Sequence, residues 1–326
     1  MTTAPDAQPA RRRIPALPFG GGRFELQEFA LVGVVGILLI AGAILEPDAF
    51  LTSDNMLNVL RQASIVGVLA IGMAFVIATG GIDLSVGSMV AAAGIAGGQF
   101  ADSGSVAFML GALAMGIALG GINATAIAYG RVVPFIATLA MFTMARGLAL
   151  WISDKTPISV FDLEALRWFG TGKIVGIPSA VLVFVGVTAL GWVLLNRTRY
   201  GRYVVAVGGN REAARIAGVK VQRIVFSVYV LSGICAAIAA ILLCGRLASA
   251  SPVSGQLYEL DAIAAVVIGG TSLAGGRATI VGTVLGVITF ALVFNLLTLM
   301  NLAVEIQQIT KGLIILAAVL VQRRER

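Results

Sequence analysis

The sequence predicts an all-α, polytopic integral membrane protein with about ten transmembrane helices, and three observations favour this class. Of the 326 residues, 58% are hydrophobic and only 12% are charged, whereas roughly 25% are charged in an average soluble domain. Uncharged runs such as 103–130 and 278–304 exceed the roughly 20 apolar residues that one helix needs to cross a bilayer. These runs do not alternate in polarity, which argues against a membrane β-barrel.

The first 27 residues differ from the rest of the chain. They are basic and rich in Pro and Gly, with three consecutive arginines at 11–13. The apolar stretch after these arginines is too broken to form the core of a signal peptide. We therefore expect a disordered cytoplasmic tail over residues 1–27 and a transmembrane domain over residues 28–326.

Ten apolar segments follow the tail, and each is predicted to form a membrane-embedded helix, two of them in Gly-interrupted segments. An even number of crossings places both termini on one side. Of the 23 Lys and Arg residues, sixteen fall on the side of the termini, five on the other side and two within spans. Because cytoplasmic loops are enriched in Lys and Arg, both termini are predicted to be cytoplasmic. The predicted segments are 29–46, 60–79, 84–101, 105–130, 134–153, 174–195, 223–245, 260–275, 277–300 and 304–322.

The net charge of +7 follows from this orientation. The basic residues are spread over the cytoplasmic ends of the spans instead of forming one patch, so no nucleic-acid partner is predicted. The chain contains no histidine, the commonest metal ligand among side chains, and no metal site is predicted.

Two apolar segments are interrupted by the same pattern, Gly-Gly-x-x-Leu-x-x-Gly, which begins at Gly80 and again at Gly269. A helix break inside the bilayer is tolerated where protein or a water-filled cavity covers the freed backbone groups. Paired Gly-interrupted segments indicate a transport route. We therefore predict that two elements line the substrate pathway: Gly80, Gly81, Asp83 and Ser85 in the first, and Gly269, Gly270, Thr271 and Ser272 in the second.

Both breaks also have a purely structural interpretation. Glycine is common in membrane helices because it lets helices approach closely. A carboxylate such as Asp83 is costly within a membrane and marks either a functional site or a buried partner. Asp83 directly precedes the apolar run that starts at Leu84, so capping of the next helix is the alternative to lining the pathway.

The longest cytoplasmic loop, residues 196–223, contains the sequence NREAARIAG, which predicts a short helix. Asn210 is suited to be its N-cap, Glu212 favours the positive N-terminal end, and Gly218 suits its C-terminus. The small side chains of Ala213 and Ala214 give the helix an apolar surface. An isolated helix of this length is marginal in water, so it must dock against another protein or against its own membrane domain.

Four separated motifs carry a resemblance to a known family. ATGGIDLSVGSMVAA, RYGRYVVAVGGNREAARIAGVKV, ELDAIAAVVIGGTSLAGG and KGLIILAAVLVQRR resemble the ribose/xylose/galactoside-type permeases of bacterial ABC importers. The resemblance extends from about residue 28 to the end of the chain. Glu212, Ala213, Ala214 and Gly218 resemble the importer signature of the helix that docks into a groove on the ATPase subunit. The resemblance therefore implies an ATPase-coupling role for these residues and for Asn210.

The resemblance implies a permease subunit that moves a monosaccharide, a ribose-like pentose or a hexose, across the bacterial inner membrane. It also implies three partners: a cytoplasmic ABC ATPase, an extracytoplasmic sugar-binding protein and a second permease copy, which would form a homodimer with this chain. ATP and magnesium would be used by the ATPase, and this chain would need no cofactor of its own. The segment GTGKIVG at 170–176 lacks the spacing of a phosphate-binding loop, so no catalytic residue is predicted.

Two other function classes remain open at this point. An ion-coupled secondary transporter also uses repeats and broken helices, but typically couples through intramembrane charges, and few are present here. A passive channel or structural subunit is the third class. On the outer side, segments 46–60, 154–173 and 246–261 are expected to receive the binding protein. Their acidic residues include Glu259 and Asp261.

Overall fold

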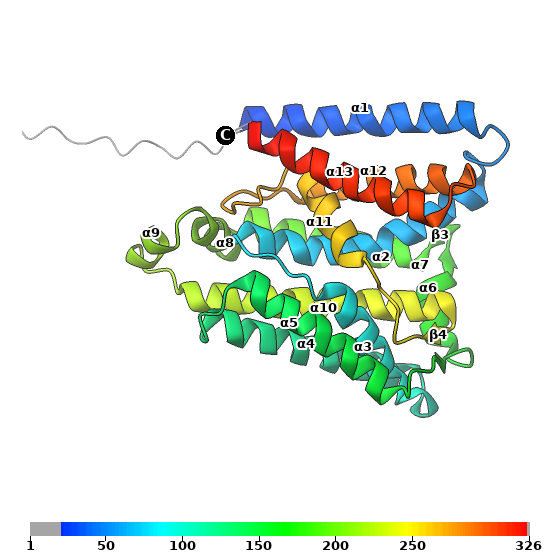
Figure 1. Ribbon diagram of the computed structural model, residues 1–326, viewed down its shortest axis with the longest axis horizontal. Coiled ribbons are helices and arrows are strands. Elements are labelled where there is room, and N and C mark those ends of the chain that lie inside the picture. Colours follow the sequence, from blue (N-terminus) through cyan, green and yellow to red (C-terminus); the bar gives the residue numbers. More distant parts are fainter. Residues whose placement is uncertain (1–20, 325–326) are drawn as a thin grey trace, which may run out of the picture.

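The computed structural model describes residues 21–324, and it describes side chains from residue 28 to residue 320. Within that range the chain is a bundle of α-helices with two very short strand pairs (Figure 1). The helices of the first half are α1 (Gly21–Leu45), α2 (Ser53–Ala78), α3 (Val86–Gly98), α4 (Ser105–Ala128), α5 (Pro134–Ile152) and α6 (Glu164–Thr171), with a 3₁₀ turn η1 (Ala101–Ser103) before α4. Those of the second half are α7 (Ser179–Trp192), α8 (Arg199–Gly209), α9 (Arg211–Ile216), α10 (Val221–Leu247), α11 (Tyr258–Ile268), α12 (Ile280–Leu299) and α13 (Val304–Arg324), with a π-helical turn η2 (Val193–Arg197) after α7.

The predicted fold class is confirmed. Each of the ten predicted segments contains a helix. Seven helices in the described part are long and apolar enough to cross a membrane: α1, α2, α4, α5, α7 with η2, α10 and α12. Helices α3 and α11 have 13 and 11 residues and are therefore about 20 and 16 Å long, too short to cross a hydrocarbon core of about 30 Å. The number of ten crossings stays a prediction.

Three predicted boundaries differ from the structure. Helix α1 begins at Gly21, so residues 21–27 of the predicted tail are helical, while residues 1–20 lie outside the described residues. The predicted span 260–275 is helical only as far as Ile268, because the Gly-Gly pair after it ends the helix. The predicted loop 196–223 contains an additional helix, α8, besides the predicted short one.

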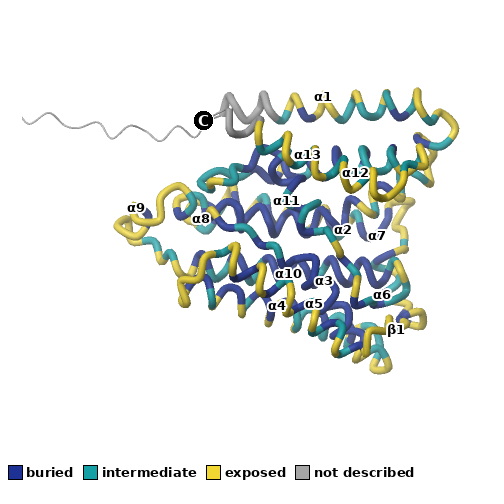
Figure 2. Tube along the Cα trace, viewed as in Figure 1, coloured by how far each residue is buried: buried dark blue, intermediate teal, exposed yellow. Residues whose placement is uncertain are grey.

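The centre of the bundle is formed by α2, α3 and α10. Most residues of these three helices are buried, and they are coloured so in Figure 2. All 13 residues of α3 are buried. By contrast, only 6% of the apolar window of α1 is buried inside the protein, so most of this helix lies on the outside of the bundle. Helices α4 and α10 pack through small residues: a Cβ on Gly120 would lie 2.8 Å from the Tyr229 carbonyl oxygen and 3.1 Å from the Gly233 Cα. Such close backbone approach is typical of membrane helices.

The molecule has two distinct ends (Figure 1). The α9 end carries α8, α9, the first described turn of α1 and the last turn of α13. The opposite end, called here the hairpin end, carries two antiparallel strand pairs. Strand β1 (Ile158–Ser159) pairs with β4 (Ser249–Ala250), and β2 (Lys173–Ile174) pairs with β3 (Ile177–Pro178).

Candidate functional site

Helix α8 forms a rigid base at the α9 end. Its N-cap Thr198 accepts a hydrogen bond from the Gly201 backbone N–H at 3.3 Å. Val204 and Val207 are fully buried, and the Tyr200 ring stacks on Phe75 of α2 with centroids 6.2 Å apart. Helix α8 is therefore fixed to α2, and it leads directly into α9.

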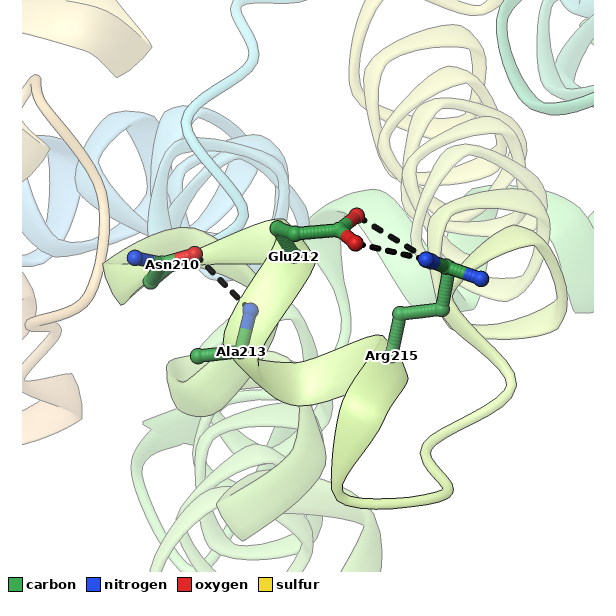
Figure 3. Close-up of polar contacts among 4 residues, drawn as sticks. All are labelled: Asn210, Glu212, Ala213 and Arg215. Atoms are coloured by element: carbon green, nitrogen blue, oxygen red, sulfur yellow. Dashed lines mark hydrogen bonds and ion pairs between the residues drawn. The ribbon is translucent and has the colours of Figure 1, made fainter.

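Helix α9 has the caps that the sequence predicts. Figure 3 shows Asn210 Oδ1 accepting a hydrogen bond from the Ala213 backbone N–H, at 2.9 Å. Gly218 lies just after the last turn with a φ of +83°, and its N–H donates to the Arg215 carbonyl at 3.0 Å. Asn at the N-cap satisfies one of the free N–H groups of the first turn, and glycine adopts the left-handed conformation at least cost. Both predicted caps are confirmed, whereas the ATPase-coupling role stays a prediction.

A surface ion pair spans α9. Glu212 accepts hydrogen bonds from Arg215 Nε at 3.0 Å and from its terminal nitrogen at 2.5 Å (Figure 3). The Arg215 guanidinium therefore holds the pKa of Glu212 below its usual value. The negative residue lies in the first turn and the positive residue in the last, the arrangement that the helix dipole favours.

Most of α9 projects from the body of the protein (Figure 1), where its backbone is coloured as exposed in Figure 2. Of the small apolar residues that the sequence places on this helix, only Ala214 is buried. Ile216 is 76% exposed. One face of α9 thus rests on its own membrane domain, and the rest of the helix is free for a partner.

The two chain breaks end their helices with the same geometry, a Schellman motif. After α2, the Gly81 N–H donates to the Val76 carbonyl and the Gly80 N–H donates to the Ile77 carbonyl. After α11, the Thr271 N–H donates to the Val266 carbonyl and the Gly270 N–H donates to the Val267 carbonyl.

The residues that correspond to each other in the two helix ends differ by one position from those that the sequence pattern pairs. The residue with left-handed backbone is Gly80 in the first break, with φ +77°, and Gly270 in the second, with φ +87°. The sequence pattern instead pairs Gly80 with Gly269. The geometry of the helix ends therefore makes Gly80 equivalent to Gly270. The Leu and the third Gly that the two sequence patterns share do not determine which residues are equivalent.

Both breaks meet each other and α8 in a cluster of close backbone contacts, called here the glycine junction (residues 78–80, 208–209 and 275–276). The Gly276 N–H donates to the Ala78 carbonyl at 3.0 Å. A Cβ on Gly275 would lie 2.7 Å from Gly80 N and 3.0 Å from the Gly208 carbonyl oxygen. Only glycine allows three backbones to approach this closely. The two broken segments and the base of α9 are therefore in direct contact.

Arg211, the first residue of α9, adds a polar link to the junction. A terminal nitrogen of its guanidinium donates to the Thr79 carbonyl at the end of α2, at 3.4 Å. The carbonyls at a helix end lack intrahelical partners, and they carry the negative end of the helix dipole. Arg211 therefore connects the exposed helix directly to the first break.

Asp83 lies in a closed polar network at the start of α3. Its side chain is fully buried. It accepts hydrogen bonds from the Ser85 backbone N–H at 3.0 Å and the Ser85 hydroxyl at 2.5 Å. The Ser232 hydroxyl of α10 donates to its other oxygen at 2.8 Å, and Asn123 of α4 donates to the Ser85 hydroxyl at 2.9 Å. In this conformation Asp83 joins the start of α3 to α10, and through Ser85 to α4. It bonds the N-cap residue Ser85 and no N–H of the first turn of α3, so it does not cap this helix in the way that the alternative expected.

Hydrogen bonds tie Thr271 and Ser272 of the second break to the residues just before α12. Thr271 is fully buried, and its Oγ1 accepts a hydrogen bond from the Thr279 N–H at 3.2 Å. The Ser272 N–H donates to the Arg277 carbonyl at 3.1 Å. These bonds fold residues 271–277 into a compact turn between α11 and α12. The assignment of both breaks to a substrate pathway stays a prediction.

The structure corrects the predicted docking surface at two residues. Glu259 is only 6% exposed, and the Asp261 side chain is 13% exposed because it pairs with Lys311 of α13 at 2.5 Å. Both residues face into the bundle from α11 and present little surface to a docking protein. Arg146 of α5 is likewise occupied, since one of its terminal nitrogens donates to the Pro252 carbonyl at 2.6 Å and the Ser254 carbonyl at 2.9 Å.

Sequence reasoning missed several residues of this site. Gly208, Gly275 and Gly276 form the junction, and Asn123 and Ser232 complete the Asp83 network. The Gly208–Gly209 pair immediately before Asn210 was an available signal, since a Gly-Gly pair directly beside the short helix indicates a close backbone approach there. The two polar partners carried no such signal, because they lie on distant helices.

Comparison with known proteins gives a matching family and similar proteins that cover most of the chain. Residues 55–319 match the family described as "Branched-chain amino acid transport system / permease component". The chain is 39% identical over 306 residues to the ribose import permease protein RbsC of Escherichia coli (strain K12), covering 92% of this chain and 95% of that protein.

Two further relatives extend the comparison. The ribose import permease protein RbsC of Bacillus subtilis (strain 168) is 45% identical over 292 residues, with coverage of 89% of this chain and 90% of that protein. The L-arabinose transport system permease protein AraH of Escherichia coli (strain K12) is 37% identical over 317 residues, with coverage of 95% and 94%. The similarity therefore extends over nearly the whole length of each protein.

Proposed function

The chain belongs to the family of branched-chain amino acid transport system permease components, and from this premise we propose that it is the membrane subunit of an ATP-driven importer of a monosaccharide. Relatives with 39% and 45% identity are ribose import permease proteins, and one with 37% identity is an L-arabinose transport permease protein. The resemblance found in the motifs is thereby confirmed. The chain is a transport component and not an enzyme.

The observation that carries the ATP-driven part of the proposal is the geometry of α9. This helix is capped at both ends, projects into solvent and is fixed through α8 to the body of the protein. Its base contacts both chain breaks at the glycine junction. A protein that grips α9 therefore pushes on both broken segments at once.

We propose that this partner is a cytoplasmic ABC ATPase, which binds the ATP and magnesium. Closure of the ATPase moves α9 and changes the relative stability of inward- and outward-facing states of the membrane domain. Such a push is effective only if the ATPase interacts differently with the two states. In this proposal the α9 end is cytoplasmic, so the described ends of α1 and α13 lie on the cytoplasmic side of the inner membrane.

An extracytoplasmic sugar-binding protein and a second copy of the permease complete the proposed assembly. The binding protein docks at the hairpin end and supplies most of the selectivity. The pathway then needs only sparse hydroxyl and backbone groups, such as those of Ser85, Thr271 and Ser272, because sugars carry many hydroxyls. We assign the Gly80 to Ser85 and Gly269 to Ser272 segments to this route.

The test is uptake of radiolabelled D-ribose and L-arabinose into proteoliposomes. Four preparations are compared: the permease alone, the permease with its ATPase and binding protein, the complete set without ATP, and the complete set with an imposed proton or sodium gradient instead of ATP. The proposal predicts uptake only in the complete set with ATP. Uptake driven by the gradient alone would identify a secondary transporter, and equal uptake by the permease alone would identify a passive channel.

A further inference from the structure

A cavity lined by both polar and apolar side chains lies in the half of the molecule near the hairpin end, away from the glycine junction. Its volume is about 270 Å³. The lining comes from the first half of α2, the second half of α12 and the first turns of α13, together with Arg246 from the last turn of α10 and Asp261 from α11. Neither chain break contributes to it, so it is separate from the predicted pathway residues.

Charged and amide side chains converge on this cavity. The Lys311 ammonium pairs with Asp261 at 2.5 Å, and their side chains are only 16% and 13% exposed. The Arg246 guanidinium reaches Gln62 across 3.5 Å, at the limit of a hydrogen bond. Gln62 therefore does not strongly engage the N–H groups of the Arg246 guanidinium. Arg246 lines the cavity, so these N–H groups can donate to a ligand there.

One wall of the cavity is aromatic. The rings of Phe290 and Phe294 lie 4.6 Å apart, centroid to centroid, and Lys311 lies 5.2 Å from the centroid of the Phe294 ring. The negative face of an aromatic ring attracts positively polarised groups, which include the C–H bonds of a sugar ring. The cavity thus offers an aromatic surface beside hydrogen-bonding groups of both kinds.

This chemistry selects a neutral ligand rich in hydroxyls. A cationic ligand would approach two cations, Arg246 and Lys311. An anionic ligand could pair with Arg246 but could not donate a hydrogen bond to Asp261, whereas a hydroxyl group can both accept and donate. An apolar ligand would remove water from the amides and charges without replacing its hydrogen bonds, which is costly. Pockets for drug-sized ligands begin at about 300 Å³, so this smaller volume suits one small molecule such as a monosaccharide.

We infer that the cavity is a low-affinity monosaccharide site on the hairpin-end side of the membrane domain, and this inference rests on the proposed function. Its amide and charged side chains hydrogen-bond the sugar hydroxyls, and its aromatic wall contacts a C–H face of the ring. The site holds the sugar between its release from the binding protein and its passage past the chain breaks.

Saturation-transfer NMR tests the site, with millimolar D-ribose or L-arabinose added to the complete permease–ATPase complex in lipid nanodiscs. The lining variants are Gln62→Leu and Asn58→Leu, whose residues are exposed enough to tolerate the change. Gln308→Leu is the matched control, because Gln308 is exposed on α13 but does not line the cavity.

We expect saturation transfer to at least one sugar with the unmodified complex and with Gln308→Leu. Each lining variant should weaken the affinity about three- to tenfold, the effect of losing one net hydrogen bond. Absence of transfer with the unmodified complex, or equal transfer in all four proteins, would overturn the site.

Uptake assays on the same four proteins separate this inference from the proposed function. ATP-driven uptake by the unmodified complex, with no effect of the lining variants on sugar binding, removes the cavity site and leaves the importer proposal standing. Binding that responds to the lining variants, in a complex without ATP-driven uptake, removes the importer proposal and leaves the sugar site.

Discussion

The two chain breaks end their helices in the same way but continue differently. Both use a Schellman turn with one glycine in the left-handed conformation. The first break continues as a short non-helical segment that places the buried carboxylate of Asp83 against Ser85 and Ser232. The second continues as a compact turn that includes Thr271 and Ser272, and it bonds both to the start of α12 and, through the Gly276 N–H, to the Ala78 carbonyl.

The comparison shows that ending a helix within the bundle and positioning the segment after it are separate structural requirements. Ending a helix within the bundle requires the free carbonyls of its last turn to be satisfied, and the Schellman turn does this in both places. The segment after each turn then decides the role of that break. The first anchors the half-helix α3 to α4 and α10 through side chains, whereas the second presents backbone to Ala78 and Gly208 at the glycine junction.

The largest effect is expected from Gly208→Ala, because its new Cβ would fall on the Ala78 carbonyl oxygen and the Gly276 nitrogen. Backbone at both sides cannot yield as a flexible side chain can, and overpacking costs about 1–3 kcal/mol. We expect ATP-driven uptake to fall about tenfold or more, with the ATPase still bound. Gly209→Ala is the matched control, since its Cβ would come no closer than 3.9 Å to Gly276 Cα. Equal uptake in the two variants would show that the junction does not transmit the movement of α9.

A second effect, on stability and not on the transmission of movement from α9, should distinguish the polar groups of the two breaks. Asp83→Ala leaves the Ser85 N–H and two hydroxyls without their acceptor, and each unsatisfied buried group costs about 1–3 kcal/mol. We expect a loss of roughly 3 kcal/mol in unfolding free energy, against less than about 0.5 kcal/mol for Ser272→Ala. Thermal unfolding in detergent compares the two. Similar losses in both variants would mean that the first break is no more an anchor than the second.

The smallest effect tests the register of the two breaks. Gly80→Ala and Gly270→Ala each force a side chain into the left-handed conformation, at about 1–2 kcal/mol, and should lower the unfolding temperature by similar amounts. In Gly81→Ala the new Cβ instead meets the Tyr229 hydroxyl. Adding Tyr229→Phe should therefore relieve Gly81→Ala but neither of the other two. Relief of Gly80→Ala by the same change would contradict the assignment of Gly80 as the left-handed residue.

Features set by local sequence were predictable. Apolar run lengths located all ten helical segments, and Asn210 and Gly218 located both ends of α9. Helix α8 was missed because its sequence RYGRYVVAVGG combines glycines with β-branched residues, which disfavour helices. Its contacts with α2 stabilise it despite that composition.

Features set by tertiary contacts were not predictable from one sequence. The one-residue shift between the breaks depends on which glycine has a positive φ. The burial of Asp261 depends on the distant side chain of Lys311 in α13, and the Asp83 network depends on Asn123 and Ser232 in other helices. In each case the local residues allow more than one arrangement, and only packing decides between them.

The most direct test of the central claim, that α9 is the element through which an ATPase drives this chain, is the Glu212→Lys variant. This change reverses the charge in the first turn of α9 and removes the ion pair with Arg215. Because Glu212 is exposed, the change should not affect membrane insertion. We predict normal amounts of the protein in the membrane, loss of co-purification with the ATPase and loss of ATP-driven uptake. Normal co-purification together with normal uptake would contradict the claim.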